Sequence, residues 1–376
     1  MNDNDTGIKC ILAGIDTLEL GVCVDDYLLA DNDWNIFEQA KESARSTPYN
    51  NDLGGIKFQG KSFRVGRAGK RRYGYILSND DISIQLNEKA QSGKYFPEVK
   101  LIFRSVYLWR DGWQKAVSET LEWLKGWLVV NRITVSRCDL TADYNCFLPM
   151  LDPELKQAVT RAVNKRDFLK DANNYGRFTN GKKQSGYVIG GKKIHCRIYD
   201  KVLEISRSNK KWFHILWQAN GWKPGQSVTR VEFQCRREFL RTIQTDTIED
   251  LGYQLADLWR YLTNDWLTLR EIGQDSHRDR WELTEFWKIA QESVGDFGQI
   301  TGISRLKQKR PSFEKTRSQV RGHMVSLYAM VMASMNGSNF KMVNRQIKNL
   351  IKHIIMDPEF EVDVIDRMPR YRGMNS

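Results

Sequence analysis

Three segments decide the fold of this chain: RCDLTAD at residues 137–143, HCRIYDK at 195–201 and RVEFQCR at 230–236. Each alternates charged or polar residues with apolar or small ones, and a period of two places the two sets on opposite faces of a β-strand. The apolar faces suit a hydrophobic core. If the strands are neighbours, their other faces gather acids, cations, a histidine and a tyrosine. That inventory is typical of metal-assisted phosphoryl transfer with a tyrosine nucleophile.

The bulk composition indicates a folded protein with an anionic partner. The chain has 376 residues, 41% of them hydrophobic, and a formal net charge of +12. This length allows two domains, and the cationic excess favours nucleic acid as the partner. A basic protein without such a partner is the simpler alternative.

The basic residues recur in patches rather than in one tail. The patches cover residues 57–72, 161–183, 305–321 and 341–352, and aromatic residues lie among the first three. Phosphate contacts and base stacking together need this mixture. The patches therefore predict a DNA-binding surface, although each one alone is also compatible with an ordinary solvated face.

The termini and the cysteines bear on the compartment. Residues 1–5 are polar and acidic, so no signal peptide is expected, and no apolar run of about 18 residues predicts a membrane span. None of the six cysteines forms a C-x-x-C pair, which argues against a zinc ribbon. We therefore expect reduced cysteines in a cytoplasmic protein with no membrane partner.

Hydrophobic periodicity predicts the order of the elements. Alternation predicts further strands over residues 15–22, 56–65, 73–77, 82–86 and 99–104. Helical spacing predicts helices over residues 34–46, 112–129, 153–169, 247–266, 283–293, 314–335 and 344–355. The polar, Gly- and Asn-rich residues 173–185 predict a mobile loop.

These elements predict an α+β fold. We expect a mixed or antiparallel sheet with helices packed on one face, an open face that forms the active site, and a helical C-terminal part. The change of composition near residue 245 predicts a sheet-based catalytic domain over residues 1–245 and a helical part over residues 246–376.

At the three strands the sequence resembles the Rep_trans family of rolling-circle replication initiators, which is related to relaxases of conjugative elements. The family pattern is an R-x-D-x-A-x-D strand, then R-x-Y-x-K-x-x-E, then R-x-E-x-x-x-R. The matching segments are Arg137–Asp143, Arg197–Glu204 and Arg230–Arg236. One departure is Thr141 before Ala142, which shifts the small residue by one place. The likeness extends over roughly residues 12–335.

The resemblance implies DNA nicking through a covalent 5′-phosphotyrosine that leaves a free 3′-hydroxyl. Tyr199 is the expected nucleophile. Many relatives have a second tyrosine in a Y-x-G-S segment upstream, where this chain has Val188 with Tyr187 one residue away, so Tyr187 is the second candidate. The alternative for Tyr199 is an ordinary strand tyrosine that donates a hydrogen bond at a sheet face.

Two cations flank the expected nucleophile. A free tyrosine, with a pKa near 10, is a weak nucleophile at neutral pH. Arg197 and Lys201, each two residues from Tyr199, would stabilise a phenolate and bind the scissile phosphate. Alternatively, both are ordinary cations paired with acids.

Acidic residues on the same faces are the expected metal ligands. The ion would be Mg²⁺ or Mn²⁺, bound through oxygen atoms of Asp139 and Glu232. Asp143 and His195 are further candidate ligands. In the alternative, Asp139 and Glu232 merely form ion pairs with Arg137 and Arg230.

Cationic residues near these strands are the expected DNA contacts. They are Arg137, Arg230, Arg236, Arg177, Lys182, Lys183, Lys192 and Lys193. Residues 173–193 would clamp single-stranded DNA over the active face, and the alternative is a solvated basic loop. Residues 305–321 would bind the duplex origin or contact a helicase.

The resemblance implies origin DNA as substrate, with a host helicase and a DNA polymerase recruited after the nick. It leaves the oligomeric state open, with a dimer as one option, and it does not separate an initiator from a relaxase. Two other functions stay open from the residues alone. A hydrolytic metal-dependent nuclease would use water in place of Tyr199, and a non-catalytic DNA-binding protein would keep the acid–cation strands as structural ion pairs.

Overall fold

The computed structural model describes residues 7–46, 55–88, 96–151, 155–161, 175–180, 183–298, 324–325, 327–333 and 339–357. The chain divides into two compact units, residues 1–305 and 306–376. The second unit contains an amphipathic helix, α10 (Phe340–Ile355), in which Val343 and Ile347 are buried. The first unit contains all three segments that the sequence singled out.

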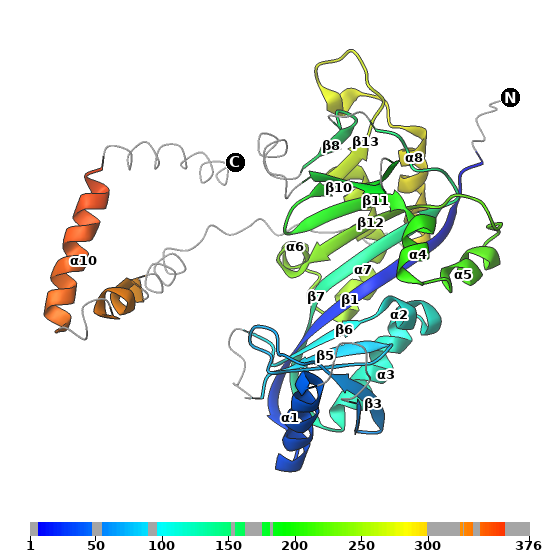
Figure 1. Cartoon of the computed structure of the whole chain (residues 1–376). Coiled ribbons are helices and arrows are strands. Elements are labelled where there is room, and N and C mark those ends of the chain that lie inside the picture. The colour runs from blue at the N-terminus through cyan, green and yellow to red at the C-terminus, as the bar shows by residue number, and fades with distance from the viewer. Residues whose placement is uncertain are drawn as a thin grey trace. The chain divides into compact units, whose positions relative to one another are not determined.

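The first unit is built on an eleven-stranded sheet, which Figure 1 shows running through its two halves. The strands are β1 (Cys10–Tyr27), β2 (Gly55–Phe58), β3 (Lys61–Val65), β4 (Tyr75–Ser78), β5 (Ile82–Leu86), β6 (Val99–Phe103), β7 (Leu128–Tyr144), β9 (Tyr175–Asn180), β10 (Lys183–Gly190), β11 (Ile194–Asp200) and β12 (Thr229–Arg236). Their spatial order is β2-β3-β4-β5-β6-β1-β7-β12-β11-β10-β9, and the described neighbours all pair antiparallel. Two short strands, β8 (Ala158–Thr160) and β13 (Leu267–Leu269), pair separately.

The sheet repeats one topology on either side of its central pair. β1 and β7 pair along almost their whole lengths, from Cys10 opposite Tyr144 to Tyr27 opposite Leu128. In the first half, β1 neighbours β6, and β5, β4, β3 and β2 follow outward; in the second half, β7 neighbours β12, and β11, β10 and β9 follow outward. In each half the first strand therefore pairs with the last, and the strands between them lead away to the edge.

Helices lie on both faces of this sheet. They are α1 (Asp31–Ser46), α2 (Ser105–Asp111), α3 (Trp113–Lys125), α4 (Lys201–Ser208), α5 (Phe213–Ala219), α6 (Arg237–Thr242), α7 (Ile248–Arg260) and α8 (Glu285–Glu292), with a π-helical turn η1 (Tyr261–Trp266) and 3₁₀ turns η2 (Arg278–Arg280) and η3 (Ser293–Phe297). No helix in the described part of the chain is long and apolar enough to cross a membrane.

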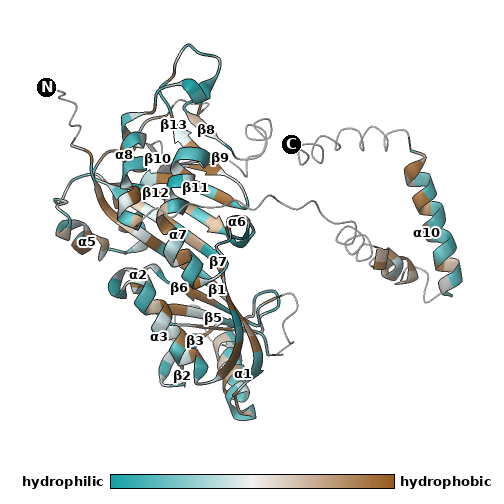
Figure 2. Cartoon of the chain, turned by 180° about the vertical axis from the view of Figure 1, so that it is seen from behind, coloured by the Kyte–Doolittle hydropathy of each residue, from teal (hydrophilic) through white to brown (hydrophobic). Residues whose placement is uncertain are grey.

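The main core joins α1, α3, α7 and α8 to the apolar face of the sheet. Phe37, Leu124, Trp259 and Trp287 share this core with Phe233 of β12. Figure 2 shows brown, hydrophobic stretches along the sheet strands and teal, hydrophilic residues along α1. Burial of these large side chains, at about 25 cal/mol for each Å² of apolar surface, is the main force that holds the helices to the sheet.

A second, smaller core covers one end of the opposite face. It contains Ile205 of α4, Phe213 and Trp217 of α5, and Trp222. The expected α+β class and the antiparallel sheet are confirmed, but the helices are not confined to one face. α4 and α5 close one end of the face that the sequence predicted to be open.

Several predicted elements match the structure and others do not. The strand at 82–86 and the helices at 34–46, 112–129, 247–266, 283–293 and 344–355 appear as β5, α1, α3, α7 with η1, α8 and α10. Residues 56–65 form the β2–β3 hairpin, because Gln59 and Gly60 adopt positive φ angles and turn the chain. Of the predicted helix at 314–335, residues 324–325 and 327–333 are helical and the remainder lies outside the described residues.

Two predictions in the middle of the chain are wrong. In the predicted helix at 153–169, residues Ala158–Thr160 form β8 instead, and residues 152–154 and 162–170 lie outside the described part. The predicted loop at 173–185 contains β9 and the start of β10, which pair as a hairpin. Polar side chains do not prevent a strand when its backbone groups find ladder partners, as those of β9 do in β10 and those of β10 do in β9 and β11.

The compact unit extends past residue 245. Leu251, Trp259 and Phe297 lie in the same hydrophobic core as the sheet, and the division between units falls at Arg305 and Leu306. The change of composition near residue 245 marks a change from strands to helices within one core. All six cysteines are free, and Cys138, Cys196 and Cys235 lie in that core as their strand faces predicted.

Candidate active site for DNA strand transfer

The three motif strands are direct neighbours in the order β7-β12-β11. Glu232 lies between Thr141 of β7 and Arg197 of β11, and Gln234 lies between Asp139 and His195. Directly opposed residues of antiparallel strands point to the same face. The alternation read from the sequence therefore does bring the predicted polar side chains together on one sheet face.

Tyr199 and Glu232 form the centre of a pocket on that face. The pocket has a volume of about 460 Å³, and Asp139, Arg197 and Lys201 also line it. The hydroxyl of Tyr199 donates a hydrogen bond of 2.8 Å to Oε2 of Glu232. Burial, and then the charge of Glu232, raise the pKa of Tyr199 well above its usual value. The resting side chain is therefore a neutral phenol whose proton already faces a carboxylate.

Arg197 bridges the two acids of the pocket. Its Nη2 forms an ion pair with Oε1 of Glu232 and lies 3.7 Å from Oδ2 of Asp139. Its Nε is buried without a hydrogen-bond partner. Among the described residues, Arg197 thus pairs with both Glu232 and Asp139, and the predicted alternative pair of Glu232 with Arg230 does not form.

Asp139 is fully buried beneath the pocket. Nε of Arg137 donates to Oδ1 of Asp139 at 2.7 Å, and the Nη2 of the same arginine pairs with Oδ2. Burial raises the pKa of Asp139 to about 7, and the nearby charge of Glu232 also raises it, although Arg137 and Arg197 act in the opposite direction. The two arginines thus do not offset the effect of burial on this carboxyl.

Asp143 and Arg230 belong to a separate, fully buried network. Oδ1 of Asp143 accepts from Nε of Arg230 at 2.5 Å, and Oδ2 accepts from Nη2 of Arg230 and from Nε1 of Trp217, both at 2.8 Å. Nη1 of Arg230 donates to Asp16 at 3.0 Å. Neither residue lines the Tyr199 pocket, so Asp143 is not placed to ligate a metal there, and Arg230, with no exposed surface, is not placed to contact DNA.

Asp16 is a site residue that the motifs do not mark. It accepts hydrogen bonds from Ser105 Oγ at 2.8 Å and from Trp109 Nε1 at 3.0 Å, besides that of Arg230. Burial opposes its charge, but Arg230 and then Lys201 hold its pKa well below the usual range. The sequence signal is a lone acid at an alternating strand position, next to Ile15.

Lys201 lies at the start of α4 and not on a strand. The side chain of Asp200 accepts from the backbone N–H of Leu203 at 3.0 Å and so caps this helix, which ends β11 one residue before the lysine. Nζ of Lys201 lies 2.6 Å from Glu204 and 3.5 Å from the hydroxyl of Tyr199. Burial and then the charge of Arg230 lower the pKa of Lys201.

His195 lies at the edge of the cluster. Burial, and then the charge of Arg197, lower its pKa to about 4, so the imidazole is neutral at pH 7. No three His, Cys, Asp or Glu side chains form a metal-ligating group in the described part of the chain. A site with His195 and both acids as ready ligands is therefore not assembled there.

The donor set nevertheless fits a hard divalent cation. Mg²⁺ and Mn²⁺ are commonly held through one or two carboxylates, with water and substrate phosphate as the other ligands. Asp139 and Glu232 are two such carboxylates in one pocket. Burial raises the pKa of Asp139, and a bound divalent ion would oppose this effect by favouring the carboxylate.

The second candidate nucleophile is enclosed. Tyr187 has no exposed surface and lies on the core face of β10, opposite Ile198. Its hydroxyl accepts a hydrogen bond of 2.8 Å from the backbone N–H of Leu151. Only Tyr199 of the two has its hydroxyl in the polar pocket.

The other predicted DNA contacts lie in different places. Lys192 and Arg236 are exposed beside a second, larger hollow, and Lys193 pairs with Glu238 at 2.7 Å. The backbones of Arg177 and Lys183 belong to β9 and β10. Their side chains, and Lys182 as a whole, lie outside the described residues.

Comparison with known proteins gives a structural likeness but no match by sequence. No family model matches the chain, and no curated protein matches it. A solved structure titled as a rolling circle replication initiator protein from Geobacillus stearothermophilus is similar, with a TM-score of 0.42 and 14% sequence identity over 80% of this chain and 100% of that chain.

Proposed function

We propose that this chain is a DNA strand transferase that nicks an origin with Tyr199 and keeps the 5′-phosphate as a phosphotyrosine. The role would be that of a rolling-circle replication initiator, and a conjugative relaxase would use the same chemistry. The observation that carries the proposal is the hydrogen bond from Tyr199 to Glu232 in a pocket that also presents Arg197 and Lys201. The matching order of the three strand motifs supports it.

The reaction is a transesterification at phosphorus. The phenolic oxygen of Tyr199 forms the new P–O bond, its proton passes to Glu232, and the bond from phosphorus to the 3′-oxygen breaks. That oxygen takes a proton from solvent and leaves as a 3′-hydroxyl. Because one phosphoester replaces another, the bond energy is conserved and the reverse reaction can rejoin the strand without ATP.

Cations of the pocket would bind the phosphate. The unpartnered Nε of Arg197 is a buried donor that a phosphoryl oxygen would satisfy. Nζ of Lys201, 3.5 Å from the hydroxyl of Tyr199, lies where the charge of a phenolate would develop. Phosphate binding would also draw Arg197 away from Glu232 and leave that carboxylate free to accept the proton.

Because a carboxylate has two oxygens, Glu232 would hold a Mg²⁺ or Mn²⁺ ion together with Asp139 and still accept the proton of Tyr199. The ion would neutralise charge on the phosphoryl oxygens. The expected partners are origin DNA, and a helicase and polymerase that use the exposed strand and the free 3′-hydroxyl. The oligomeric state is open, with a dimer as one option.

A denaturing gel tests the proposal. Labelled single-stranded origin DNA is incubated with wild-type protein and with Tyr199→Phe, with Mn²⁺ or with EDTA. We expect a metal-dependent protein–DNA band that Tyr199→Phe lacks. Cleavage without a covalent band, unchanged in Tyr199→Phe, would establish a hydrolytic nuclease instead, and DNA binding without any cleavage would establish a non-catalytic binding protein.

A further inference from the structure

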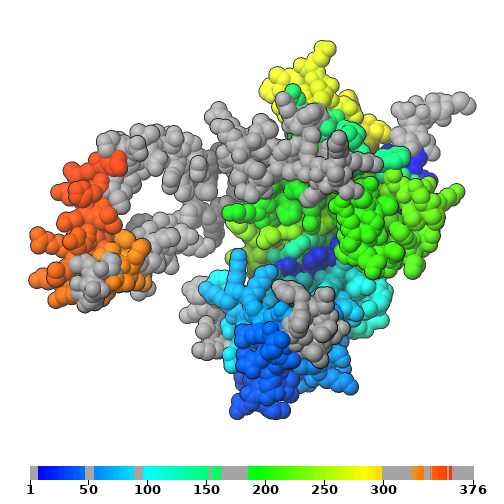
Figure 3. Space-filling view, viewed as in Figure 1, coloured from blue at the N-terminus to red at the C-terminus, as the bar shows by residue number. Residues whose placement is uncertain are grey.

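A larger hollow lies on the same sheet face as the Tyr199 pocket. It has a volume of about 1480 Å³, and Figure 3 shows the surface hollowed between the blue and cyan residues of the first half and the green residues of the second. Eight cationic residues line it against three acidic ones: Lys70, Arg71, Arg72, Lys100, Arg137, Lys192, Arg236 and Arg237 against Glu19, Glu98 and Glu238. We call this hollow the basic groove.

The basic groove spans the two halves of the sheet, from Lys100 and Gln85 in the first to Arg137 and Arg236 in the second. Lys100 of β6 opposes Gln85 of β5, as Glu232 of β12 opposes Arg197 of β11. Lys100 and Gln85 line the basic groove, whereas Glu232 and Arg197 line the Tyr199 pocket. The groove has the charge to bind phosphates, and the hydroxyl of Tyr73, which also lines it, donates to the carbonyl oxygen of Pro97 at 3.2 Å.

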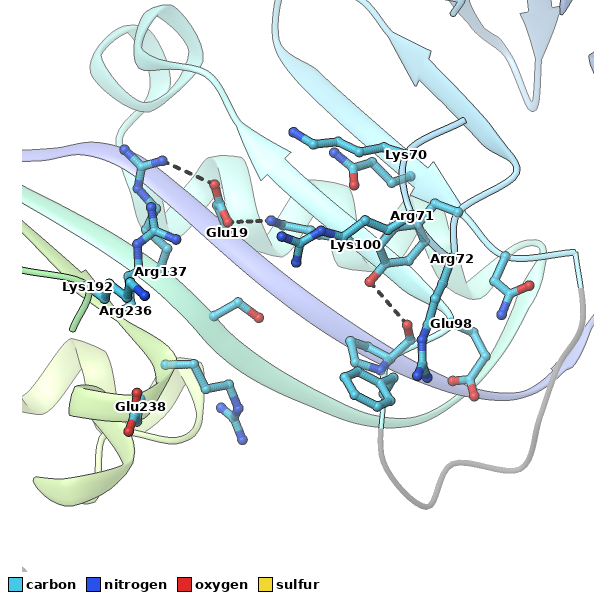
Figure 4. Close-up of a pocket in the computed structure, with 17 residues that line it drawn as sticks. Glu19, Lys70, Arg71, Arg72, Glu98, Lys100, Arg137, Lys192, Arg236 and Glu238 are labelled. Atoms are coloured by element: carbon cyan, nitrogen blue, oxygen red, sulfur yellow. Dashed lines mark hydrogen bonds and ion pairs between the residues drawn. The ribbon is translucent and has the colours of Figure 1, made fainter. Parts of the chain in front are cut away.

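An aromatic side chain lies at the far side of the groove. Phe96 is 56% exposed, and the guanidinium of Arg72 lies over its ring, 3.9 Å from the centroid. Figure 4 shows Arg71 and Arg72 across the groove from Arg137 and Lys192. An exposed ring stacked with arginine inside a cationic groove is the arrangement on which unpaired bases stack. A duplex hides its base faces, so these residues fit a single strand.

A tight turn presents the cations of this side. The backbone N–H of Lys70 donates to Tyr73 and the reverse bond is also formed, at 2.9 and 3.1 Å, which closes a two-residue turn with Arg71 at a positive φ of 56°. A Cβ on Gly69 would lie 2.3 Å from the carbonyl oxygen of Tyr73. The turn therefore depends on glycine at this position, and it holds Arg71 and Arg72 over the groove.

The groove leads directly to the catalytic pocket. Arg137 lines both hollows. Between Arg137 and the Phe96 side lies Glu19, which pairs with Arg137 at 3.4 Å and with Lys100 at 2.6 Å, as the dashed lines in Figure 4 show. A strand can thus pass from Phe96 across Lys100 and Arg137 to Tyr199 without leaving one face of the sheet.

We infer that the basic groove holds the single-stranded DNA arm next to the scissile phosphate. Phe96 and Arg72 stack its bases, and Arg71, Lys100 and Arg137 contact its phosphates. The inference rests on the proposed function, since it assigns the path of the strand that Tyr199 would cut.

Binding without chemistry tests it. Each variant carries Tyr199→Phe and is titrated in EDTA against fluorescein-labelled oligo(dT) and a duplex of equal length, by fluorescence anisotropy. We expect Phe96→Ala to weaken oligo(dT) binding about tenfold or more, because one stacked base is lost. Removing two phosphate contacts with Arg71→Ala and Lys100→Ala should reduce the slope of log affinity against log salt by about 1.4.

Matched controls lie outside the groove. Phe147 is 83% exposed and Lys223 is exposed, and neither lines the basic groove. Phe147→Ala and Lys223→Ala should leave oligo(dT) binding unchanged. The inference is overturned if Phe96→Ala binds like Phe147→Ala, or if Phe96→Ala weakens duplex and single strand equally.

The two proposals fail differently. If the groove variants lose oligo(dT) binding and wild type forms no covalent band, the single-strand binding groove is supported and the nicking function is refuted. A normal covalent band with normal binding by every groove variant would keep the nicking function and refute the groove.

Discussion

The hydroxyl of Tyr199 points at Oε2 of Glu232, on the neighbouring strand, at 2.8 Å. The two residues are diagonal neighbours, since Tyr199 directly opposes Arg230 and Glu232 directly opposes Arg197. The phenolic proton therefore faces a glutamate. From the sequence we expected Arg197 and Lys201, each two residues from Tyr199, to stabilise the phenolate. In the proposed reaction the pair would be a nucleophile and its base, within hydrogen-bond distance of each other.

Glu232→Gln should slow covalent adduct formation by about 100-fold or more, because a glutamine can orient the phenol but cannot take its proton. The rate of the variant should rise with pH, since hydroxide must then replace the base. Single-turnover adduct formation across pH 6 to 9 measures this. Glu122→Gln, which changes an exposed acid that lines neither hollow, is the control and should react like wild type. Equal rates for Glu232→Gln and wild type would remove the base role.

The buried carboxyl of Asp139 should make stability depend on pH. Its pKa is raised from a model-peptide value of 3.8 to about 7. Between about pH 4 and pH 7, the folded state therefore keeps a proton on this carboxyl and the unfolded state does not. Stability relative to Asp139→Asn should therefore fall as pH rises through this window, by about 1.4 kcal/mol for each pKa unit that separates the two states. Urea denaturation in EDTA at several pH values checks it. A constant difference between the two proteins would contradict the raised pKa.

A divalent cation should remove that penalty. Mn²⁺ bound at Asp139 would favour the carboxylate, so the melting temperature of wild type at pH 8 should rise with Mn²⁺ concentration, because the ion binds the folded state. Asp139→Asn should show no such rise. Asp143→Asn loses the ion pair with Arg230 and is therefore less stable, but its melting temperature should still rise with Mn²⁺. A rise of equal size in Asp139→Asn would place the ion elsewhere.

The fold was predictable for segments in which polar and apolar residues alternate between the two faces of a strand, such as residues 137–143. Within such a segment the sequence does not distinguish the role of Asp139 from that of Asp143, because both are aspartates on the same face of the strand. What separates them is α5, whose Trp217 reaches Asp143 and closes that end of the face. This contact depends on how a helix from residues 213–219 folds back, which strand periodicity does not report.

The repeated topology was not predictable for a similar reason. Strand pairing in each half follows from backbone ladders, and the side chains that β6 and β12 present differ in charge, as Lys100 and Glu232 do. The hairpin of β9 and β10 was missed because its polar residues are typical of loops. Tyr187 was a candidate only because it lies one residue from the tyrosine position of the Y-x-G-S segment. Its side chain is buried on the core face of β10 and does not reach the Tyr199 pocket.

Tyr187→Phe therefore separates the two candidate tyrosines. The change removes one acceptor from the buried N–H of Leu151 and should cost about 1 kcal/mol of stability. It should leave adduct formation unchanged under conditions in which the variant is folded, while Tyr199→Phe abolishes it. Urea denaturation and the denaturing gel measure the two effects. Loss of the adduct in a folded Tyr187→Phe protein would reverse the assignment.

Arg230 should be required for folding and not for DNA binding. Arg230→Ala would leave the carboxylates of Asp143 and Asp16 buried without their cation, which typically costs about 3–5 kcal/mol. Arg230→Lys should recover only part of this loss, because an ammonium cannot pair with both acids through the fork of a guanidinium. The matched control is the exposed Arg236, whose change to Ala should alter stability by no more than about 0.5 kcal/mol but should weaken binding of single-stranded DNA. Urea denaturation and anisotropy distinguish the two residues, and an Arg230→Ala protein as stable as wild type would show that this buried network does not hold the strand face together.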